Sequence, residues 1–340
     1  MNAGSHARLI IRLGIKLPSI VSCALRMALL SSVLAAGTSY AQTWPDKPIH
    51  LLVPFAPGGT VDIVARANGK RLGEELGQPF VIENKAGAGG TIAATIVAKS
   101  PPDGYTLMLM HQGLAFNAAL YPSLPYDTVH DLAPIASIGA TPNALVVTNS
   151  FAVQTPQEFV AYARANPGKV TFGSGGIGSA GHLSMELLQS LTGIQLAHVP
   201  YKGSGPALLG LMTGEIQSML LTMPAVMPYL KSKRMRAIGT SGIARSPALP
   251  TLPTLAESGV AGYEYLPWFG MFGPAAMPPS AVKRLNIAIN KIIVEPAIRD
   301  QFAQQGLEVQ PLSPDQFAEI VKADVVKWGR IIRTAGVRAD

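Results

Sequence analysis

The sequence predicts an α/β protein of two domains with mostly parallel sheets. Short β-rich runs alternate with amphipathic helical stretches along most of the 340 residues, and this alternation is typical of α/β architecture. Several of the runs are continuously apolar, as expected of strands that helices cover on both faces. The length exceeds the roughly 100–200 residues of one ordinary domain, which favours two.

Nine runs have the composition of strands and are bounded by turn residues. We predict strands at residues 49–55, 80–84, 107–110, 144–148, 170–173, 197–201, 217–221, 235–240 and 269–273.

The helical stretches begin and end at recognisable signals. Residues 60–76 place their apolar side chains on one face and are followed by glycine and proline. Thr155 and Glu158 form a capping box with proline at the first helical position, and Ser313 and Gln316 repeat it before the last helix. We expect that last helix to run to about residue 335.

Two places resemble crossings between domains. One is the strand around 141–150, which Pro142 and Asn149 flank, and the other is the segment 263–278, where WFGMFGP lies between Gly/Pro-rich stretches. A chain that crosses out and back builds one domain from both of its ends. We therefore predict that residues 42–148 and 263–340 form one lobe and residues 149–262 the other.

The first 41 residues have the order of a secretory signal. Four basic residues and no acidic one are followed by an apolar run at 27–37 and by a small-x-small sequence before Gln42. The apolar run is too short to span a bilayer core of about 30 Å. We predict a signal peptide, residues 1–41, and a mature protein in the periplasm. Translation from Met27 is an alternative start, but it would remove Arg26, the last basic residue before the apolar run.

The only cysteine, Cys23, lies within this leader. Its surroundings loosely resemble a lipoprotein site, although Arg26 interrupts the apolar stretch and most of that stretch follows the cysteine. Because no cysteine remains after residue 41, disulfides, thiolate nucleophiles and zinc–thiolate sites are excluded from the mature chain. We expect the mature protein to bind neither a metal nor a cofactor. We also expect it to be a monomer.

The basic character of the chain also comes partly from the leader. The formal net charge is +7, but four of the 27 basic residues precede residue 42 and 20 acidic residues follow it. The mature chain is therefore only slightly basic, and its 6% of aromatic residues is too few for a single-strand nucleic-acid platform. Nucleic acid is not an expected partner.

Three glycine-rich loops each follow a predicted strand and open a predicted helix, at residues 54–59, 85–90 and 173–181. Glycine lets the backbone approach a ligand closely, and the free N–H groups of a helix N-terminus favour an anion. Turn geometry alone would explain any one of these loops. Three of them at one cleft would favour an anion-binding site.

Two features near these loops permit more than one interpretation. Asp62 follows the first loop in the first turn of a helix, where it either compensates the helix dipole or contacts the ligand. Gly176, Gly178 and Gly181 match the dinucleotide fingerprint in spacing, but the acidic residue expected about 20 residues later is missing. The sequence therefore does not favour a nucleotide.

Signatures of catalysis are also missing. The sequence has no G-x-S-x-G elbow, no H-E-x-x-H and no P-loop. His182 and His198 are interpreted as structural hydrogen-bonding residues, whereas His111 follows an apolar strand where an α/β crevice opens and either role fits it. Tyr201 could line a pocket, and the neighbouring Lys202 either steers an anion or is solvated.

An ordered set of motifs over nearly the whole mature chain resembles one family. The motifs are WPDKP (44–48), VPFAPGG (53–59), ENK (83–85), GAGG (87–90), PDGYTL (102–107), LPYD (124–127), HVPYKG (198–203), RSPALP (245–250), PT (253–254), WFG (268–270) and KWG (327–329). The sequence is similar in these segments to the Bug-type extracytoplasmic solute receptors of tripartite tricarboxylate transporters.

The resemblance implies a type II periplasmic-binding-protein fold with two lobes and an interlobe cleft. It also implies a receptor that holds a small organic carboxylate, often through water, and delivers it to membrane transporter subunits. An orphan sensor that docks on a signalling protein and an exported enzyme on the same scaffold are the alternatives. The last would need a nucleophile–base or acid–base pair in the cleft, for which the sequence has no strong candidate.

This chain departs from the family pattern at two places. Gly175 to Gly178 stand where a Ser-Gly-Asn-Gly loop is common, and Thr222 stands where an acidic residue is frequent. Without that acid an ammonium group lacks a counter-charge, which favours a carboxylate without an amine. The expected ligand-binding residues are Phe55, Ala56, Pro57, Gly58, Gly59, Thr60, Asp62, Gly89, His111, Gln112, Ser174, Gly176, Gly178, Ser179, His182, Tyr201, Lys202 and Thr222.

Overall fold

The computed structural model describes residues 44–121 and 123–335. Within this part, everything from residue 45 onward belongs to one compact unit. The predicted signal peptide, residues 1–41, and Cys23 lie outside the described residues. Among the residues described, no helix is both long enough and apolar enough to cross a membrane.

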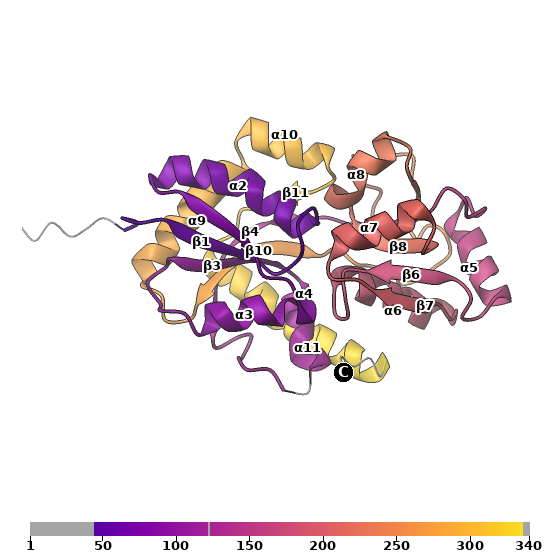
Figure 1. The fold of residues 1–340 in the computed structure, drawn as a ribbon, viewed down its shortest axis with the longest axis horizontal. Helices are drawn as coiled ribbons and strands as arrows, with labels where there is room; N and C mark the ends of the chain where they lie inside the picture. The colour runs from indigo at the N-terminus through magenta and orange to yellow at the C-terminus, as the bar shows by residue number, and fades with distance from the viewer. Residues whose placement is uncertain (1–43, 122, 336–340) are drawn as a thin grey trace, which may run out of the picture. The chain divides into compact units, whose positions relative to one another are not determined.

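The first of two β-sheets has the strand order β11-β4-β10-β3-β1-β2 (Figure 1). Its strands come from both ends of the chain. They are β1 Ile49–Val53, β2 Phe80–Asn84, β3 Thr106–His111, β4 Leu132–Ala140, β10 Trp268–Pro274 and β11 Glu308–Val309.

The second sheet has the order β7-β6-β8-β5-β9 and comes from the middle of the chain. Its strands are β5 Asn143–Val147, β6 Thr171–Ser174, β7 Ala197–Pro200, β8 Ser218–Thr222 and β9 Arg236–Thr240. The chain therefore changes sheet between β4 and β5 and returns between β9 and β10. The predicted boundary at residue 148 leaves β5 with the first part of the chain, whereas β5 pairs with β8 and β9.

The fold class is confirmed, but the prediction that the sheets are mostly parallel is wrong. β1 pairs in parallel with β2 and β3, and β6 pairs in parallel with β7 and β8. The pairs that β4, β5 and β10 make are antiparallel. These strands adjoin the two crossings, where the chain enters or returns to a sheet without the helical crossover that parallel neighbours need.

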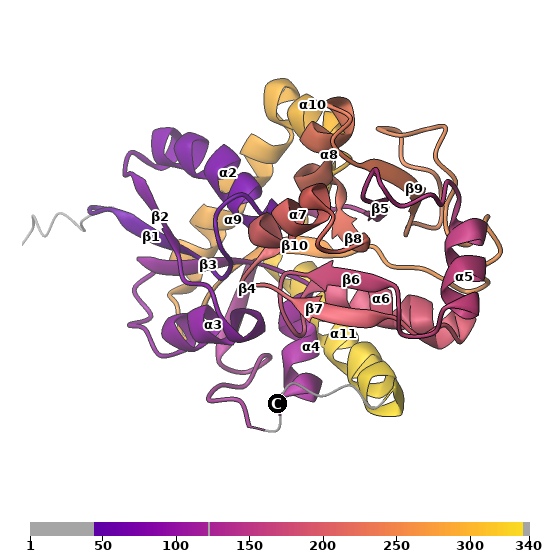
Figure 2. The same cartoon turned by 45° about the vertical axis from the view of Figure 1, so that its right-hand side comes forward.

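Helices cover both faces of each sheet (Figures 1 and 2). In the first sheet, α2 and α9 contact one face and α3, α4 and α11 the other; in the second, α7 and α8 lie opposite α6. The helices are α2 Thr60–Leu76, α3 Thr91–Ala98, α4 Gly113–Leu120, α5 Pro156–Ala165, α6 Ala180–Thr192, α7 Ser204–Thr213, α8 Met223–Lys231, α9 Pro279–Ile293, α10 Pro296–Gln304 and α11 Pro314–Ala335, with a 3-10 turn η1 Ala88–Gly90.

The C-terminal helix α11 completes a core that the middle of the chain begins. Trp328 and Ile332 of α11 pack in one buried cluster with Phe116 of α4 and Phe172 of β6. The rings of Phe116 and Trp328 lie 4.7 Å apart at an angle of 60°. This packing holds α4, whose N-terminus reaches the candidate site, against the second sheet.

Most local signals predict the elements well, and β4 is the main omission. α2 has the predicted bounds, and both capping boxes form, because Thr155 accepts from Glu158 N and Ser313 accepts from Gln316 N. β4 escapes prediction because proline and glycine interrupt it. Its register with β10 shifts at two irregularities, where such residues are tolerated within a strand.

Candidate functional site

A small cavity of about 20 Å³ lies where loops of the two sheets meet. This volume is enough for about one water-sized group. The first sheet contributes the β1–α2 loop and the end of β3, and the second contributes the starts of α6 and α7 and the end of β8. The lining residues are Phe55, Gly59, Thr60, Val61, His111, Ser179, Ala180, Gly181, Ser204, Leu221 and Thr222.

Four helices begin at this cavity, and α4 begins close to it. Thr60, Ala180 and Ser204 are the first residues of α2, α6 and α7, whereas Thr222 precedes α8 and His111 lies two residues before α4. The first turn of a helix has N–H groups without intrahelical partners and a partial positive charge. None of the described lining residues is Lys or Arg, so the positive potential here comes from the backbone. The cavity is suited to an anionic head group.

The β1–α2 loop is held in place by Asp62. Its carboxylate accepts hydrogen bonds from Gly58 N, Asn84 Nδ2 and Arg66 Nε, each at 3.0 Å. Burial alone would raise the pKa of Asp62, but these hydrogen bonds and the charge of Arg66 lower it overall. Asp62 is thus an ionised group that fixes the loop; it does not line the cavity.

His111 is placed to donate a hydrogen bond without carrying a charge. Gly113 N donates to Nδ1 of His111 at 2.8 Å, so the neutral imidazole carries its proton on Nε2. Burial lowers the pKa of His111 to about 4, and the ring stacks on Phe55 at a centroid distance of 4.9 Å. The lining residue His111 is therefore neutral near pH 7.

Two stacked histidines support the second-sheet loop 174–179. The rings of His182 and His198 lie 4.2 Å apart. Gly178 N donates to Nδ1 of His182 at 3.1 Å, and Ser174 Oγ is 2.7 Å from Nε2 of His198. Burial lowers the pKa values of His182 and His198 to about 3 and about 4, the charge of His198 lowering that of His182 further. These contacts agree with the interpretation of His182 and His198 as structural hydrogen-bonding residues.

The loops of the two sheets meet closely around the cavity. The hydroxyls of Thr60 and Thr222 hydrogen-bond to each other across it. A Cβ on Gly205 would lie 2.7 Å from the carbonyl oxygen of Pro57, and one on Gly203 would lie 2.9 Å from Cβ of Ala56. No side chain fits at these two glycines while the loops keep this arrangement.

A wider cavity of about 300 Å³ continues beyond Phe55. Glycine-rich segments of both sheets form most of its walls, and the exposed Lys202 is its only described cation. Its lining residues are Phe55, Ala86, Gly87, Ala88, Gly89, Tyr121, Gly175, Gly176, Ile177, Pro200, Tyr201, Lys202 and Gly203.

Comparison with known proteins identifies the family. The model of the tripartite tricarboxylate transporter family receptor matches residues 64–337, most of the chain. The chain belongs to this receptor family. The protein BugT of Bordetella pertussis is 37% identical to this receptor over 307 residues, which are 90% of this chain and 94% of BugT.

Solved structures of similar sequence share the fold of this receptor. A Rhodopseudomonas palustris protein, Rpa4515, solved with adipate, is 37% identical with a TM-score of 0.84, over 86% of this chain and 98% of that one. MatC of the same organism, solved with malate, is 32% identical with a TM-score of 0.81, over 85% and 100%. The periplasmic binding protein BugD is 32% identical with a TM-score of 0.84, over 87% and 100%.

The receptor structure brings ten of the expected residues to the two cavities. Phe55 lines both of them. The small cavity adds Gly59, Thr60, His111, Ser179 and Thr222, and the wider one adds Gly89, Gly176, Tyr201 and Lys202.

The other expected residues support the loops or lie elsewhere. Ala56, Pro57 and Gly58 belong to the first loop, and Ser174, Gly178 and His182 belong to the second loop and its support. Gln112 lines neither of these cavities, because its Nε2 donates to Asp324 of α11 at 2.7 Å. Its place beside the ligand stays a prediction.

The sequence reasoning missed Ser204, which begins α7 at the small cavity. The N-cap of α7 is Gly203, whose φ of 119° favours glycine. A single glycine does not distinguish a helix start from a turn, and no Ser, Thr, Asp or Asn side chain caps α7.

Proposed function

We propose that this receptor binds a small organic carboxylate, with one carboxylate oxygen in the small cavity and the rest of the ligand extending into the wider one. The convergence of four helix N-termini, with that of α4 close by, on a cavity whose described lining has no Lys or Arg carries the proposal. A carboxylate oxygen accepts from backbone N–H groups, from the two threonine hydroxyls and from Nε2 of His111. Phe55 lies between the two cavities and contacts the apolar part of the ligand.

The ligands of the relatives support this chemistry. Adipate and malate are both dicarboxylates with a short carbon chain. The roughly 300 Å³ of the wider cavity lies at the lower end of the range of small-molecule sites. Lys202 stands at this wider cavity and is suited to a second carboxylate by charge alone.

We propose further that the two sheets belong to two lobes that close on the ligand. The donors are divided between the lobes, because α2 and α4 follow strands of the first sheet and α6, α7 and α8 follow strands of the second. Only the closed arrangement brings all of them to one ligand. The hydrogen bond between Thr60 and Thr222 then joins the lobes next to the ligand.

Export and delivery complete the proposed role. We propose that residues 1–41 direct the chain to the periplasm, where the mature monomer passes its ligand to membrane transporter subunits and acts by binding, without catalysis. N-terminal sequencing of the protein from the periplasmic fraction is expected to find a start at or near Gln42. Recovery of the full-length chain from the cytoplasm would contradict this.

A thermal-shift screen of mono-, di- and tricarboxylic acids tests the ligand class. The mature protein is first unfolded and refolded to remove carried-over ligand. A carboxylate at 100 times its dissociation constant adds about 2.7 kcal/mol to the free energy of unfolding. For a chain of this size, that corresponds to a midpoint increase of roughly 5 °C or more.

A matched pair of variants links the shift to the cavity. Thr222→Val removes one cavity hydroxyl at nearly constant volume and is expected to weaken carboxylate binding about tenfold. Thr95→Val is the control, because the Thr95 hydroxyl bonds within α3, to Thr91 O. If only amines, sugars or nucleotides shift the midpoint, or if the two variants bind alike, the proposal fails.

A further inference from the structure

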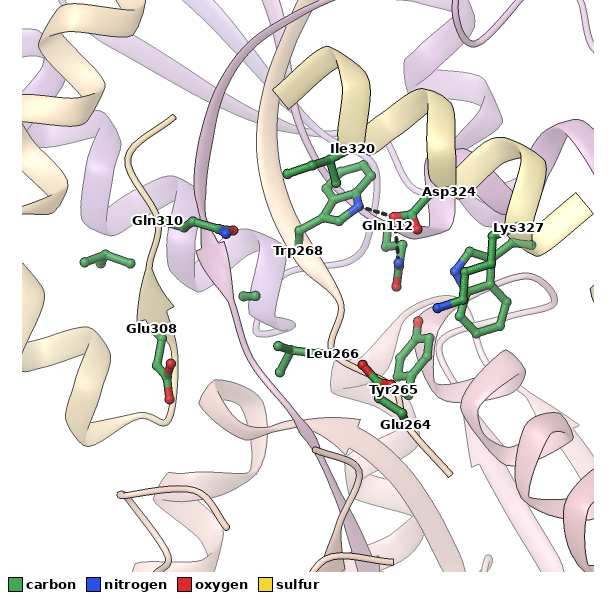
Figure 3. A pocket seen from close by; sticks show the side chains of 13 residues that line it. Gln112, Glu264, Tyr265, Leu266, Trp268, Glu308, Gln310, Ile320, Asp324 and Lys327 are labelled. Atoms are coloured by element: carbon green, nitrogen blue, oxygen red, sulfur yellow. Dashed lines mark hydrogen bonds between the residues drawn. The ribbon is translucent and has the colours of Figure 1, made fainter. Parts of the chain in front are cut away.

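A third cavity, of about 490 Å³, lies beside the crossing segments (Figure 3). We call it the α11 cavity. It borders Ala140, where the chain leaves the first sheet, and residues 264–268, where the chain returns to it. Its lining residues are Gln112, Ala140, Glu264, Tyr265, Leu266, Trp268, Glu308, Val309, Gln310, Ile320, Asp324, Lys327 and Trp328.

Three buried polar atoms in the walls of the α11 cavity have no hydrogen-bond partner among the described residues. They are Oε1 of Gln112, the hydroxyl of Tyr265 and Nε1 of Trp328. These residues are only 6%, 1% and 3% exposed. A buried polar atom that stays unpaired is destabilising, so each of these atoms favours a ligand that pairs with it. Figure 3 shows the carbonyl end of Gln112, the hydroxyl of Tyr265 and the ammonium end of Lys327 pointing toward one space.

These groups include both hydrogen-bond acceptors and donors. Gln112 Oε1 and the half-buried carboxylate of Asp324 accept from an ammonium group. Asp324 is held in place, because its Oδ2 accepts from Trp268 Nε1 at 2.6 Å and from Gln112 Nε2 at 2.7 Å. Trp328 Nε1 and Lys327 donate to a carboxylate. An α-amino acid head group has both charges on neighbouring atoms and matches this set.

The remaining charges of the α11 cavity favour a second positive group on the ligand. Glu264 and Glu308 are exposed and line the cavity from two other elements (Figure 3). With Asp324 they outnumber the single described cation, Lys327. Among the described residues, no three His, Cys, Asp or Glu side chains could hold one metal ion. The carboxylates of Asp324, Glu264 and Glu308 are therefore better suited to an extended organic cation than to a metal ion.

We propose that the α11 cavity is a second binding site and that it takes a basic amino acid such as L-lysine. The α-ammonium group is bound by Asp324 and Gln112, the α-carboxylate by Trp328 and Lys327, and the side-chain ammonium by Glu264 or Glu308. This inference does not depend on the proposed carboxylate ligand, because the two sites share no lining residue in the part of the chain that the structure describes.

Isothermal titration of the refolded mature protein tests this site with three probes. L-Lysine is expected to bind saturably with one site per chain. Cadaverine, which lacks the α-carboxylate, and L-norleucine, which lacks the side-chain ammonium, are each expected to bind at least tenfold more weakly. Equal binding of either analogue would overturn the proposed recognition, and so would the absence of L-lysine binding.

Variants then locate the bound amino acid. Asp324→Asn is expected to weaken L-lysine binding at least tenfold, and so is Lys327→Met, whose exposed side chain leaves folding unaffected. Thr222→Val in the carboxylate site is the control and should bind L-lysine like the wild type. If Thr222→Val alone weakens binding, or if neither Asp324→Asn nor Lys327→Met does, L-lysine binds elsewhere and the proposal is wrong.

Discussion

A single methyl group at Gly205 should separate ligand binding from folding. Gly205 is the second residue of α7, with helical backbone, so alanine is compatible with its conformation. Replacing a helical glycine by alanine adds up to about 1 kcal/mol to the free energy of unfolding. In the closed arrangement, however, the new Cβ would lie 2.7 Å from the carbonyl oxygen of Pro57, which belongs to the opposite loop.

The expected loss of affinity follows from this overlap. Ordinary contacts of a Cβ atom begin near 3.4 Å, so the two loops must separate by roughly 0.7 Å. Overpacking of this kind costs about 1–3 kcal/mol. Because only the closed form carries this cost, Gly205→Ala should bind the carboxylate about 5- to 150-fold more weakly. Its ligand-free midpoint should stay at the wild-type value or rise by up to about 4 °C.

Titration calorimetry with the carboxylate that gives the largest thermal shift measures this change. Gly329→Ala in α11 is the matched control, since the described atom nearest to its Cβ would be the flexible end of Arg333, at 3.3 Å. The control should bind like the wild type. If Gly205→Ala also does so, the described contact between α7 and Pro57 is not part of the ligand-bound state. A lower ligand-free midpoint would instead show that the variant damages the fold.

Two further predictions concern pH and salt. His111 alone should lower the free energy of unfolding by about 3 kcal/mol between pH 6.5 and 4, because its pKa is near 6.5 in the unfolded chain and about 4 when buried. Urea titrations of His111→Gln should show a loss that is smaller by this amount, and equal losses for variant and wild type would contradict this cause. Lys202→Ala should lower carboxylate affinity less than about fivefold, because Lys202 is exposed. That loss should disappear in 1 M salt, whereas a large, salt-independent loss would indicate direct pairing.

The sequence predicts the elements of the site better than their contacts. The three glycine-rich loops could be found because each lies between a recognisable strand and helix. Ser204 was missed because nothing local marks the start of α7, and its closeness to Gly59 depends on how the two sheets meet. The side chain of Gln112 contacts α11, which lies more than 200 residues later in the chain. No local pattern contains that contact.

The topology was predicted least well, for a related physical reason. Strand composition and helix punctuation are local, and they predicted the bounds of α2 and both capping boxes. Strand direction depends on which strands become neighbours, and the chain pairs β10 antiparallel to both β3 and β4 after its second crossing. Where a helix joins two strands, the alternation of strands and helices favours a parallel pair. The sequence does not indicate between which strands a returning strand such as β10 inserts, and so it does not predict the direction of that strand relative to its neighbours.

The proposed recognition of an anion by helix N-termini would also explain how the ligand can leave. Each helix contributes roughly half an elementary charge at its start, and this partial charge is fixed to the backbone. A flexible Arg or Lys could follow the ligand as the lobes separate, whereas a backbone N–H group moves with its sheet. Opening would therefore remove the donors of α2 and α4 from those of α6, α7 and α8 in one step. Affinity that is divided between two lobes in this way depends steeply on closure, which suits a receptor that must both hold its ligand and give it up.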